Sequence, residues 1–375
     1  MQLLAFCAIL FCMPSLNQFL VSGSMPPPPS STPHTMSHTM SHTISSNYKR
    51  PIIFSDVDGT LVQYEDKEDD EDLDADEALK RSDFLDSLVS MPATSTGKVG
   101  YISPRTLELL CRIKEEYDGY VCLVSGARTS TLAQRAPFFV HEGRSAIDAF
   151  SSESGGRLFV NKNEENDLGL FEELTFYGER HDLAPLSSLK AKLREANFVV
   201  DDRDYTHQFR LRRSKQENDA MKAAFDELLV KSETGVEGVS KTANLGCSDF
   251  FPSTSGKRSI GAFLASKMRE LNEISGTAGK KRLCVFTCGD DDNDVELAKG
   301  DFVDFSIFPK KNGARVKAGE VEGLVQIEEG EKLNRFSFTG RDVEDNSGRK
   351  AWEQLREDIF ATERMLVAII DEIEK

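Results

Sequence analysis

Two aspartates separated by a single residue are the first feature of this sequence that could do chemistry. Asp56 and Asp58 follow the apolar run 51–55 and precede Gly59. Such a run is typical of a buried parallel strand, and a glycine turn at its end lets both carboxylates face the strand mouth. Two carboxylates so close repel each other unless a cation intervenes, and Mg²⁺ prefers carboxylate and water oxygens. One carboxylate could then attack phosphorus while the other exchanges a proton with the leaving group.

Two further segments carry groups that suit an anion. Ser125, Gly126 and Arg128 follow the apolar run 120–124, and a hydroxyl with backbone N–H groups at a helix start can bind phosphate. Arg128 could contact a substrate or lie on the surface of that helix. Lys257 stands at a loop-to-helix junction, where its charge could hold a transferring phosphoryl group.

A third apolar run, at 283–287, is followed by a strongly acidic segment, Gly-Asp-Asp-Asp-Asn-Asp at 289–294. Four acids among five residues are costly to place together without a metal ion. The segment therefore adds to the case for a cation.

The elements that would position these groups alternate between strands and helices. Ser103 is a predicted helix N-cap, and Pro104 is favoured at the next position. Strand–helix–strand alternation predicts a parallel sheet with right-handed crossovers. Such sheets bind ligands at the carboxyl ends of their strands, where Asp56, Ser125 and Asp290 fall.

A segment of different character is inserted between the second and third of these strands. Helices are predicted at 184–196 and 219–231, and a hairpin is predicted at 198–211, so the insert is a mixed α+β unit. Its hinges would be the Gly-Gly pair at 155–156 and the Gly-, Pro- and Ser-rich stretch 246–256.

In this order, the four polar segments resemble the motifs of the haloacid dehalogenase (HAD) superfamily. The matching residues are Asp-Val-Asp-Gly-Thr at 56–60, the strand-end Ser125, Lys257, and Gly-Asp-x-x-Asn-Asp at 289–294. The second aspartate of the first motif points to the phosphatase branch. The resemblance covers roughly residues 50–155 and 249–315.

The position of the insert, after Glu-Ser-Gly-Gly at 153–156, is similar to that in type IIB members with a C2-type cap. These include sucrose-phosphate, mannosyl-phosphoglycerate and Cof-like phosphatases. The resemblance implies an α/β fold: a HAD-like Rossmannoid three-layer core with a parallel sheet, plus an inserted α+β C2-type cap domain. The expected parts are a signal-peptide-like leader at 1–24, a linker at 25–49, the core at 50–156 and 249–330, the cap at 157–248, and a C-terminal extension with a helix at 331–375.

The resemblance also implies a role for each matching residue. Asp56 would be the nucleophile that forms an aspartyl-phosphate, and Asp58 the general acid/base. The phosphate- and substrate-binding set would be Ser125, Gly126, Arg128, Lys257 and Asn293. Mg²⁺ would be held by the carboxylates of Asp56 and Asp290 and the backbone carbonyl of Asp58, while Asp294 would support the metal or orient Lys257.

These roles predict a Mg²⁺-dependent phosphomonoesterase that acts on a small phosphorylated metabolite, with a sugar phosphate as the favoured class. One rival is a phosphotransferase or mutase that passes the phosphoryl group to a hydroxyl other than water. The other is a catalytically inert scaffold that binds a phosphate ligand.

Two charged regions are open to a functional or a solvated interpretation. Arg210 and Arg212 would share one strand face of the insert, where they could recognise substrate or pair with nearby aspartates. Residues 65–77 hold ten acids and one lysine. That run is either a solvated loop or an electrostatic gate against highly anionic substrates.

Composition and the amino-terminal segment bear on possible binding partners and on the cellular location. A net charge of −17 argues against nucleic-acid binding. The apolar run 2–12 has signal-peptide length and is too short to span a membrane. We expect secretory entry or signal-dependent import into an organelle such as a plastid, with a cytoplasmic location as the alternative. The Cys spacing indicates neither a disulfide framework nor a zinc site.

Overall fold

The computed structural model describes residues 49–65, 73–94, 97–162, 170–230, 234–244, 247–274, 282–309, 335–339 and 351–375. The predicted leader and nearly all of the predicted linker lie outside these residues. Within them, the five cysteines are free thiols, and no helix is both long enough and apolar enough to cross a bilayer.

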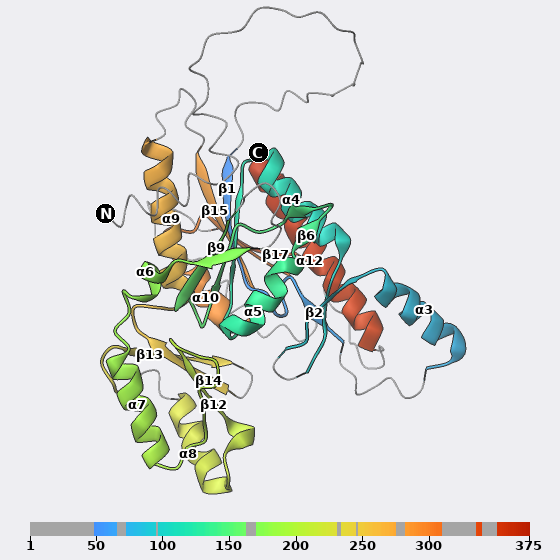
Figure 1. Cartoon of the computed structure of the whole chain (residues 1–375). Coiled ribbons are helices and arrows are strands. Elements are labelled where there is room, and N and C mark those ends of the chain that lie inside the picture. Colours follow the sequence, from blue (N-terminus) through green and yellow to red (C-terminus); the bar gives the residue numbers. More distant parts are fainter. Residues whose placement is uncertain are drawn as a thin grey trace, which may run out of the picture.

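An eight-stranded, mostly parallel sheet forms the centre of the molecule (Figure 1). Its order is β10 (Phe171–Glu173), β9 (Arg157–Asn161), β8 (Ala149–Ser152), β5 (Tyr120–Val124), β1 (Arg50–Ser55), β15 (Leu283–Cys288), β16 (Phe305–Pro309) and β17 (Arg335–Thr339). The six strands from β8 to β17 are parallel, and β9 and β10 are antiparallel additions at one edge. The expected α/β core with a parallel sheet is confirmed.

Helices cover both faces of this sheet because its central strands are apolar on both sides. Along β1, Ile53 points to one apolar cluster, while Ile52 and Phe54 point to the other. The first cluster includes α4 (Pro104–Glu116), α5 (Thr129–Arg135) and α12 (Ala351–Glu374). The second includes α6 (Thr175–Gly178), α9 (Lys257–Ile274) and α10 (Asp292–Ala298). The result is the expected three-layer core.

The C-terminal region belongs to this core instead of extending from it. Strand β17 pairs with β16 in parallel, and α12 packs against α4 and β16. The hydroxyl of Thr362 on α12 donates to the carbonyl oxygen of Thr60 at 2.6 Å. The predicted extension is therefore a structural layer that touches the loop after the first motif.

The inserted α+β unit has its own four-stranded antiparallel sheet, seen below the core in Figure 1. Its order is β11 (Val200–Asp201), β12 (Phe209–Arg212), β14 (Cys247–Pro252) and β13 (Val239–Asn244), and its helices are α7 (Ala184–Glu195) and α8 (Asp219–Val230). Side chains of β12 and β14 alternate in the usual way of strands. Phe209, Leu211 and Phe250 therefore pack on the helices, whereas Arg210 and Asp249 lie on the opposite face.

The predicted bounds of this unit, 157 and 248, can be compared with the strand pairing. Strands β9 and β10 lie within the predicted cap range 157–248, but they pair in the central sheet, because the turn at 153–156 closes the β8–β9 hairpin. Strand β14 crosses the predicted end at 248 and completes the sheet of the insert. The pairing therefore favours an insert that begins near residue 180 and ends near residue 252.

A smaller three-stranded sheet follows the first motif, in the order β2 (Gln63–Tyr64), β4 (Gly100–Ile102) and β3 (Val89–Met91). Helix α3 (Ala75–Asp86) lies between β2 and β3 in the chain, and we call residues 61–102 the flap. The acidic run 65–77 is partly helix, since Asp74 caps α3 in a capping box with Glu77. Its residues 66–72 lie outside the described part of the chain.

Short elements complete the described structure. They are β6 (Val140–His141), β7 (Arg144–Ser145) and the 3-10 helices η2 (Ala136–Phe138) and η3 (Arg213–Lys215).

Candidate active site

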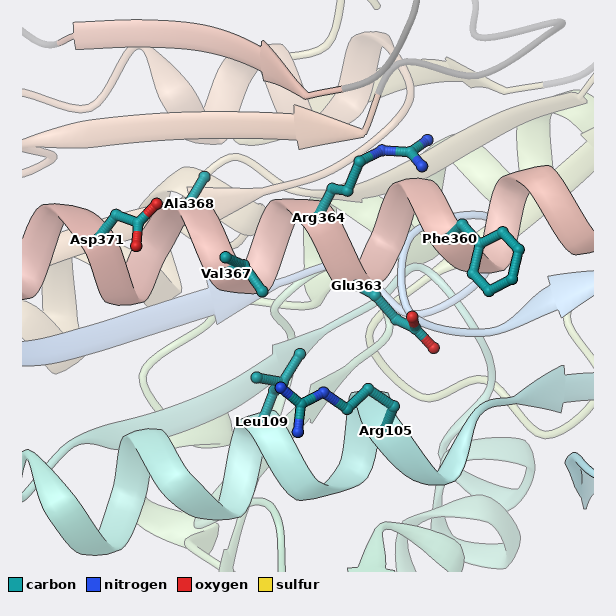
Figure 2. Close-up of a pocket in the computed structure, with 8 residues that line it drawn as sticks. All are labelled: Arg105, Leu109, Phe360, Glu363, Arg364, Val367, Ala368 and Asp371. Carbon is teal, nitrogen blue, oxygen red and sulfur yellow. The ribbon is translucent and has the colours of Figure 1, made fainter.

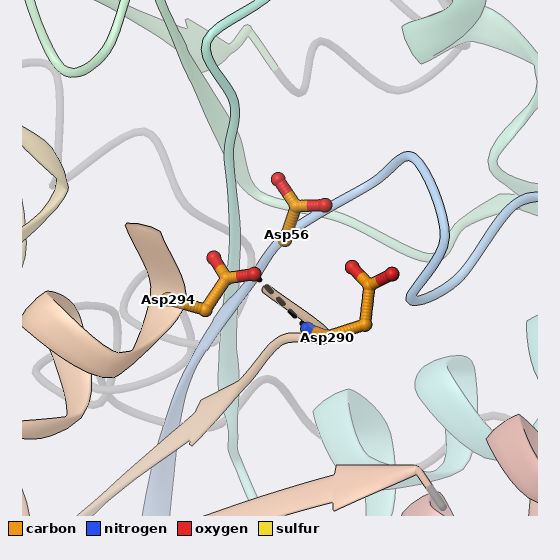
Figure 3. Close-up of side chains that lie close together, drawn as sticks. All are labelled: Asp56, Asp290 and Asp294. Atoms are coloured by element: carbon orange, nitrogen blue, oxygen red, sulfur yellow. Dashed lines mark hydrogen bonds between the residues drawn. The ribbon is translucent and has the colours of Figure 1, made fainter. Parts of the chain in front are cut away.

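Three carboxylates converge where β1 and β15 end side by side (Figure 3). Asp56 follows β1, and Asp290 and Asp294 follow β15. One ligand oxygen of each lies within 4.8 Å of those of the other two. The parallel register of the two strands, Ser55 opposite Cys288, is what brings these distant segments together.

Lys257 joins two of these carboxylates. It is the first residue of α9, and its Nζ donates to Asp56 Oδ1 and to Asp294 Oδ1, each at 2.7 Å. The three side chains are almost fully buried. A buried ammonium requires such partners, because an unpaired charge in the interior is strongly unfavourable.

Asp294 has donors on both of its oxygens. Oδ1 accepts from Lys257, and Oδ2 accepts the backbone N–H groups of Asp290 and Asp291 at 3.0 and 3.2 Å. Of the two roles expected for Asp294, this geometry favours the orientation of Lys257 over direct metal ligation.

Gly59 makes room for Asp290. Its φ is +89°, and a Cβ at this position would lie 2.3 Å from Asp290 Oδ2. The hydroxyl of Thr60 donates to Asp290 Oδ1 at 3.1 Å. The turn after the first motif therefore sets the position of a carboxylate that is 230 residues away in the sequence.

Burial and mutual repulsion change the protonation of this cluster. Burial raises the pKa of Asp56 to about 7, and nearby carboxylates add to the rise while Lys257 opposes it. The pKa of Asp294 is also raised by burial, against the effect of Lys257. For Lys257, burial would lower the pKa, but Asp294 and Asp56 outweigh it and raise the pKa above the usual range.

The donor set fits Mg²⁺. Asp56 and Asp290 offer hard carboxylate oxygens, and the cluster with Asp294 carries more negative charge than Lys257 neutralises. A divalent cation would remove the repulsion and keep Asp56 ionised at neutral pH.

Asp58 has a different environment from Asp56. Its Oδ1 accepts from Arg135 Nη1 at 2.5 Å and from the hydroxyl of Tyr64. Burial and the neighbouring Asp58 charge raise the pKa of Tyr64, so the phenol stays protonated and can donate. Sequence reasoning missed Arg135 and Tyr64, since nothing in their local pattern separates them from ordinary helix and strand residues.

The segment after β5 lies on the other side of β1 from β15. Ser125 is buried, and its Oγ accepts the N–H of Ala127 at 3.1 Å. The Gly126 carbonyl accepts from Gln208 of the insert at 3.2 Å. These contacts position the segment, while its phosphate binding stays a prediction.

Two other predicted substrate-binding residues contact the insert. Arg128 donates to Asp201 Oδ2 at 2.7 Å and to the carbonyl of Arg203 at 2.8 Å, and its guanidinium lies over the Tyr205 ring. Asn293 Oδ1 accepts from the hydroxyl of Thr242 on β13. In this structure both residues hold the insert against the core.

The core-facing side of the insert's sheet is polar and its charges are paired. Arg210 makes a two-point ion pair with the buried Asp249, and a Cβ on Gly126 would lie 3.6 Å from an Asp249 oxygen. Arg212 lies on the same strand face, whereas Arg213 pairs with Asp226. Arg210 therefore faces the segment after β5, which is the position expected of a residue that contacts substrate. Its charge is neutralised by Asp249.

A shallow groove between α4 and α12 contains none of the predicted site residues (Figure 2). Its lining mixes apolar side chains such as Leu109, Phe360 and Val367 with charged ones such as Arg105 and Glu363. We assign it no role.

Comparisons with known proteins give distant similarities. No family model matches the chain, and no curated protein matches it. Among solved structures, trehalose-6-phosphate phosphatase from Aspergillus fumigatus is 12% identical with a TM-score of 0.41, covering 86% of this chain and 94% of that chain. The C-terminal domain of the C. albicans trehalose-6-phosphate phosphatase is 10% identical with a TM-score of 0.45, and the match covers 86% of this chain and 94% of that chain. A haloacid dehalogenase-like hydrolase protein from Bacillus subtilis is 17% identical with a TM-score of 0.39, and the match covers 77% of this chain and 90% of that chain. At these values the function has to be argued from the site.

Proposed function

We propose that this protein is a Mg²⁺-dependent phosphomonoesterase of the HAD type, with its inserted α+β unit as a C2-type cap. One observation carries the proposal: Lys257 bridges Asp56 and Asp294 beside Asp290, at the ends of two adjacent parallel strands. Phosphoryl transfer needs a nucleophile and positive charge around the phosphoryl oxygens, and this group of residues supplies both.

In the proposed reaction, Asp56 attacks phosphorus and the alcohol leaves with a proton from Asp58. Asp58 then takes a proton from water, whose oxygen attacks the aspartyl-phosphate, so that phosphate is released and Asp56 is restored. Lys257 holds the phosphoryl oxygens throughout. Mg²⁺ held by Asp56 and Asp290 would neutralise charge on the same oxygens.

The charge balance of the cap supports a sugar phosphate as substrate. Arg210 is already paired with Asp249, and Arg128 with Asp201, so neither guanidinium offers an unneutralised charge to a second anionic group. Paired guanidinium and carboxylate groups are suited to the hydroxyls of a neutral sugar.

A phosphate-release assay with Mg²⁺ tests this function. The panel compares neutral-headed sugar monophosphates with phosphoglycerates, nucleotides and bisphosphates. We expect the highest kcat/KM for sugar monophosphates, a loss of turnover on chelation of the metal, and a raised KM for them in Arg210→Ala. An unchanged KM in that variant would refute the substrate role of Arg210.

The Asp56→Asn variant tests the nucleophile. Turnover should fall by roughly 10³-fold or more while circular dichroism stays native, because the amide is a far poorer nucleophile. The control is Asp118→Asn, the same change at a residue paired with Arg50 outside the site. Retained activity in Asp56→Asn would overturn the mechanism. Transfer of phosphate to added glycerol would favour a phosphotransferase, and inertness of the wild type would favour a scaffold.

A further inference from the structure

Arg135 is a fully buried arginine whose contacts all lie beside the proposed general acid. It is the last residue of α5, and its side chain has no exposure to solvent. Nη1 contacts Asp58 Oδ1 at 2.5 Å and the Tyr64 hydroxyl at 2.8 Å, and Nε donates to the carbonyl of Pro92 at 3.0 Å. Burying a guanidinium has a large desolvation cost, so the side chain depends on these partners to offset that cost.

The three contacts come from separate parts of the chain. Asp58 belongs to the loop after β1, Tyr64 to β2, and Pro92 directly follows β3. Arg135 therefore connects the first-motif loop to two parts of the flap, the strand β2 and the residue after β3. The side chain of Asp58 can hold its orientation only while the flap strands and α5 keep their places.

The contact to Asp58 uses one carboxylate oxygen. Oδ1 accepts both Arg135 and Tyr64, and among the described residues no hydrogen bond to Oδ2 occurs. Arginine commonly makes two parallel hydrogen bonds to a carboxylate, but here Nη2 of Arg135 is buried without a hydrogen-bond partner. A two-point pair would satisfy Nη2 and would also occupy Oδ2.

A general acid that later serves as a base needs one oxygen open to the reacting groups. The side chain of Asp58 is 35% exposed, unlike that of Asp56, so an oxygen can reach a leaving group on the open side. Fixing Oδ1 restricts both side-chain torsions of Asp58, and such restriction raises the fraction of reactive geometries. The unsatisfied Nη2 is an energetic cost of this one-point contact.

We propose that Arg135 is a positioning residue: with Tyr64, it anchors Asp58 Oδ1 so that Oδ2 is presented to the leaving group and then to water. The inference rests on the proposed function, in which Asp58 gives a proton to the departing alkoxide oxygen and takes one from water. Arg135 itself does not touch the substrate.

The leaving group provides the test. An alkyl leaving group such as a sugar alkoxide needs the proton from Asp58, whereas p-nitrophenolate leaves without one. The value of kcat/KM reports the step in which the leaving group departs, so it is measured for p-nitrophenyl phosphate and for the sugar monophosphate hydrolysed fastest in the panel above.

In Arg135→Met we expect kcat/KM for the sugar phosphate to fall by about 30- to 100-fold, and by less than about 5-fold for p-nitrophenyl phosphate. The first loss is at or below the lower limit of the roughly 10²- to 10⁴-fold that a general acid contributes, because Asp58 itself is still present. The sugar-phosphate loss should be in kcat, with KM little changed. Arg135→Lys, which keeps a donor to Oδ1, should recover part of it. Tyr64→Phe removes a single hydroxyl and should give a smaller loss with the same preference, which keeps the test valid if Arg135→Met does not fold.

Two comparisons complete the experiment. Arg50→Met removes an arginine that also contacts a carbonyl and a carboxylate, those of Asp118, and it should leave both rates unchanged. Asp58→Asn should show the same leaving-group dependence as Arg135→Met, and the double variant should lose little more than Asp58→Asn. The positioning role alone would be overturned by the following pair of results. In Arg135→Met and Tyr64→Phe, kcat/KM would fall equally for the sugar phosphate and p-nitrophenyl phosphate, whereas in Asp58→Asn it would fall much more for the sugar phosphate. If Asp58→Asn shows no leaving-group dependence, the proposed acid step fails and the positioning role fails with it.

Discussion

Glu153 is the residue whose removal would best test how the insert is held on the core. It lies in the β8–β9 turn and is completely buried. Its Oε2 accepts the backbone N–H groups of Thr206 and His207 at 2.7 and 2.6 Å, and its Oε1 accepts the Thr129 hydroxyl at 2.8 Å. One carboxylate thus joins the turn to the segment between β11 and β12.

The magnitude follows from the two charge-assisted backbone contacts. Hydrogen bonds to charged groups contribute about 1.5–3 kcal/mol each, and the lower end applies because water can reach the exposed Thr206. Glu153→Ala should therefore cost about 3 kcal/mol, which corresponds to a Tm decrease of about 6 °C. Glu153→Gln keeps one acceptor oxygen and should cost about 1–2 kcal/mol.

Hydrogen exchange separates a local from a global effect. In Glu153→Ala the amides of Thr206 and His207 should exchange about 100-fold faster, since their opening costs about 3 kcal/mol less. Fluorescence of Trp352, the one tryptophan of the chain, reports unfolding of the core from α12. The control Glu172→Gln changes an exposed carboxylate paired with Lys162 and should stay within about 0.5 kcal/mol of the wild type.

The reasoning would be refuted by a specific result. If Glu153→Ala left both the amide exchange at 206–207 and the unfolding midpoint as in the wild type, the carboxylate would not be what holds this segment. If the midpoint fell but exchange at 206–207 did not change, Glu153 would stabilise the turn and not the junction with the insert.

Two further predictions concern pH and the first-motif turn. Burial, with nearby cations, lowers the pKa of His181 to about 4. Between about pH 6.5 and 4 the unfolded chain therefore binds a proton that the folded chain does not, so stability falls as pH falls, by up to about 1.4 kcal/mol per pH unit from this group. His181→Gln should flatten the curve of unfolding free energy against pH by that amount, and an identical slope in both proteins would contradict the shift. Gly59→Ala should lower kcat/KM by about 100-fold with the fold kept, because the new Cβ displaces Asp290. Gly143→Ala, which has a similar positive φ but no atom within 4 Å of the added Cβ, should retain activity, and equal activity in the two variants would contradict the proposed displacement of Asp290.

Local pattern was sufficient to predict the central strands and the main helices. The apolar runs before Asp56, Ser125 and Asp290 are β1, β5 and β15, and the N-cap Ser103 starts α4. These features depend on neighbours a few residues apart, so a single sequence contains them. The direction of parallel strands then placed their polar ends at one edge of the sheet.

Pairings between distant segments are not visible in local pattern. The glycines at 155–156 were interpreted as a hinge, but they close a hairpin of the central sheet, since a glycine-rich turn has the same local sequence in both situations. The sequence predicts a helix within 331–375, and only the packing of α12 against α4 and β16 shows that this helix completes a layer of the core.

By itself the sequence determined which residues could act as nucleophile, acid and cation-binding groups, because the spacing of the aspartates and the strand-end pattern are local properties. Tertiary structure decided how those groups are connected. Lys257 meets a carboxylate 201 positions away, Arg135 meets Asp58 across 77 positions, and Thr362 meets Thr60 across 302. Contacts at such separations arise from the packing of whole elements and the pairing of buried charges, and one-dimensional spacing carries no record of either.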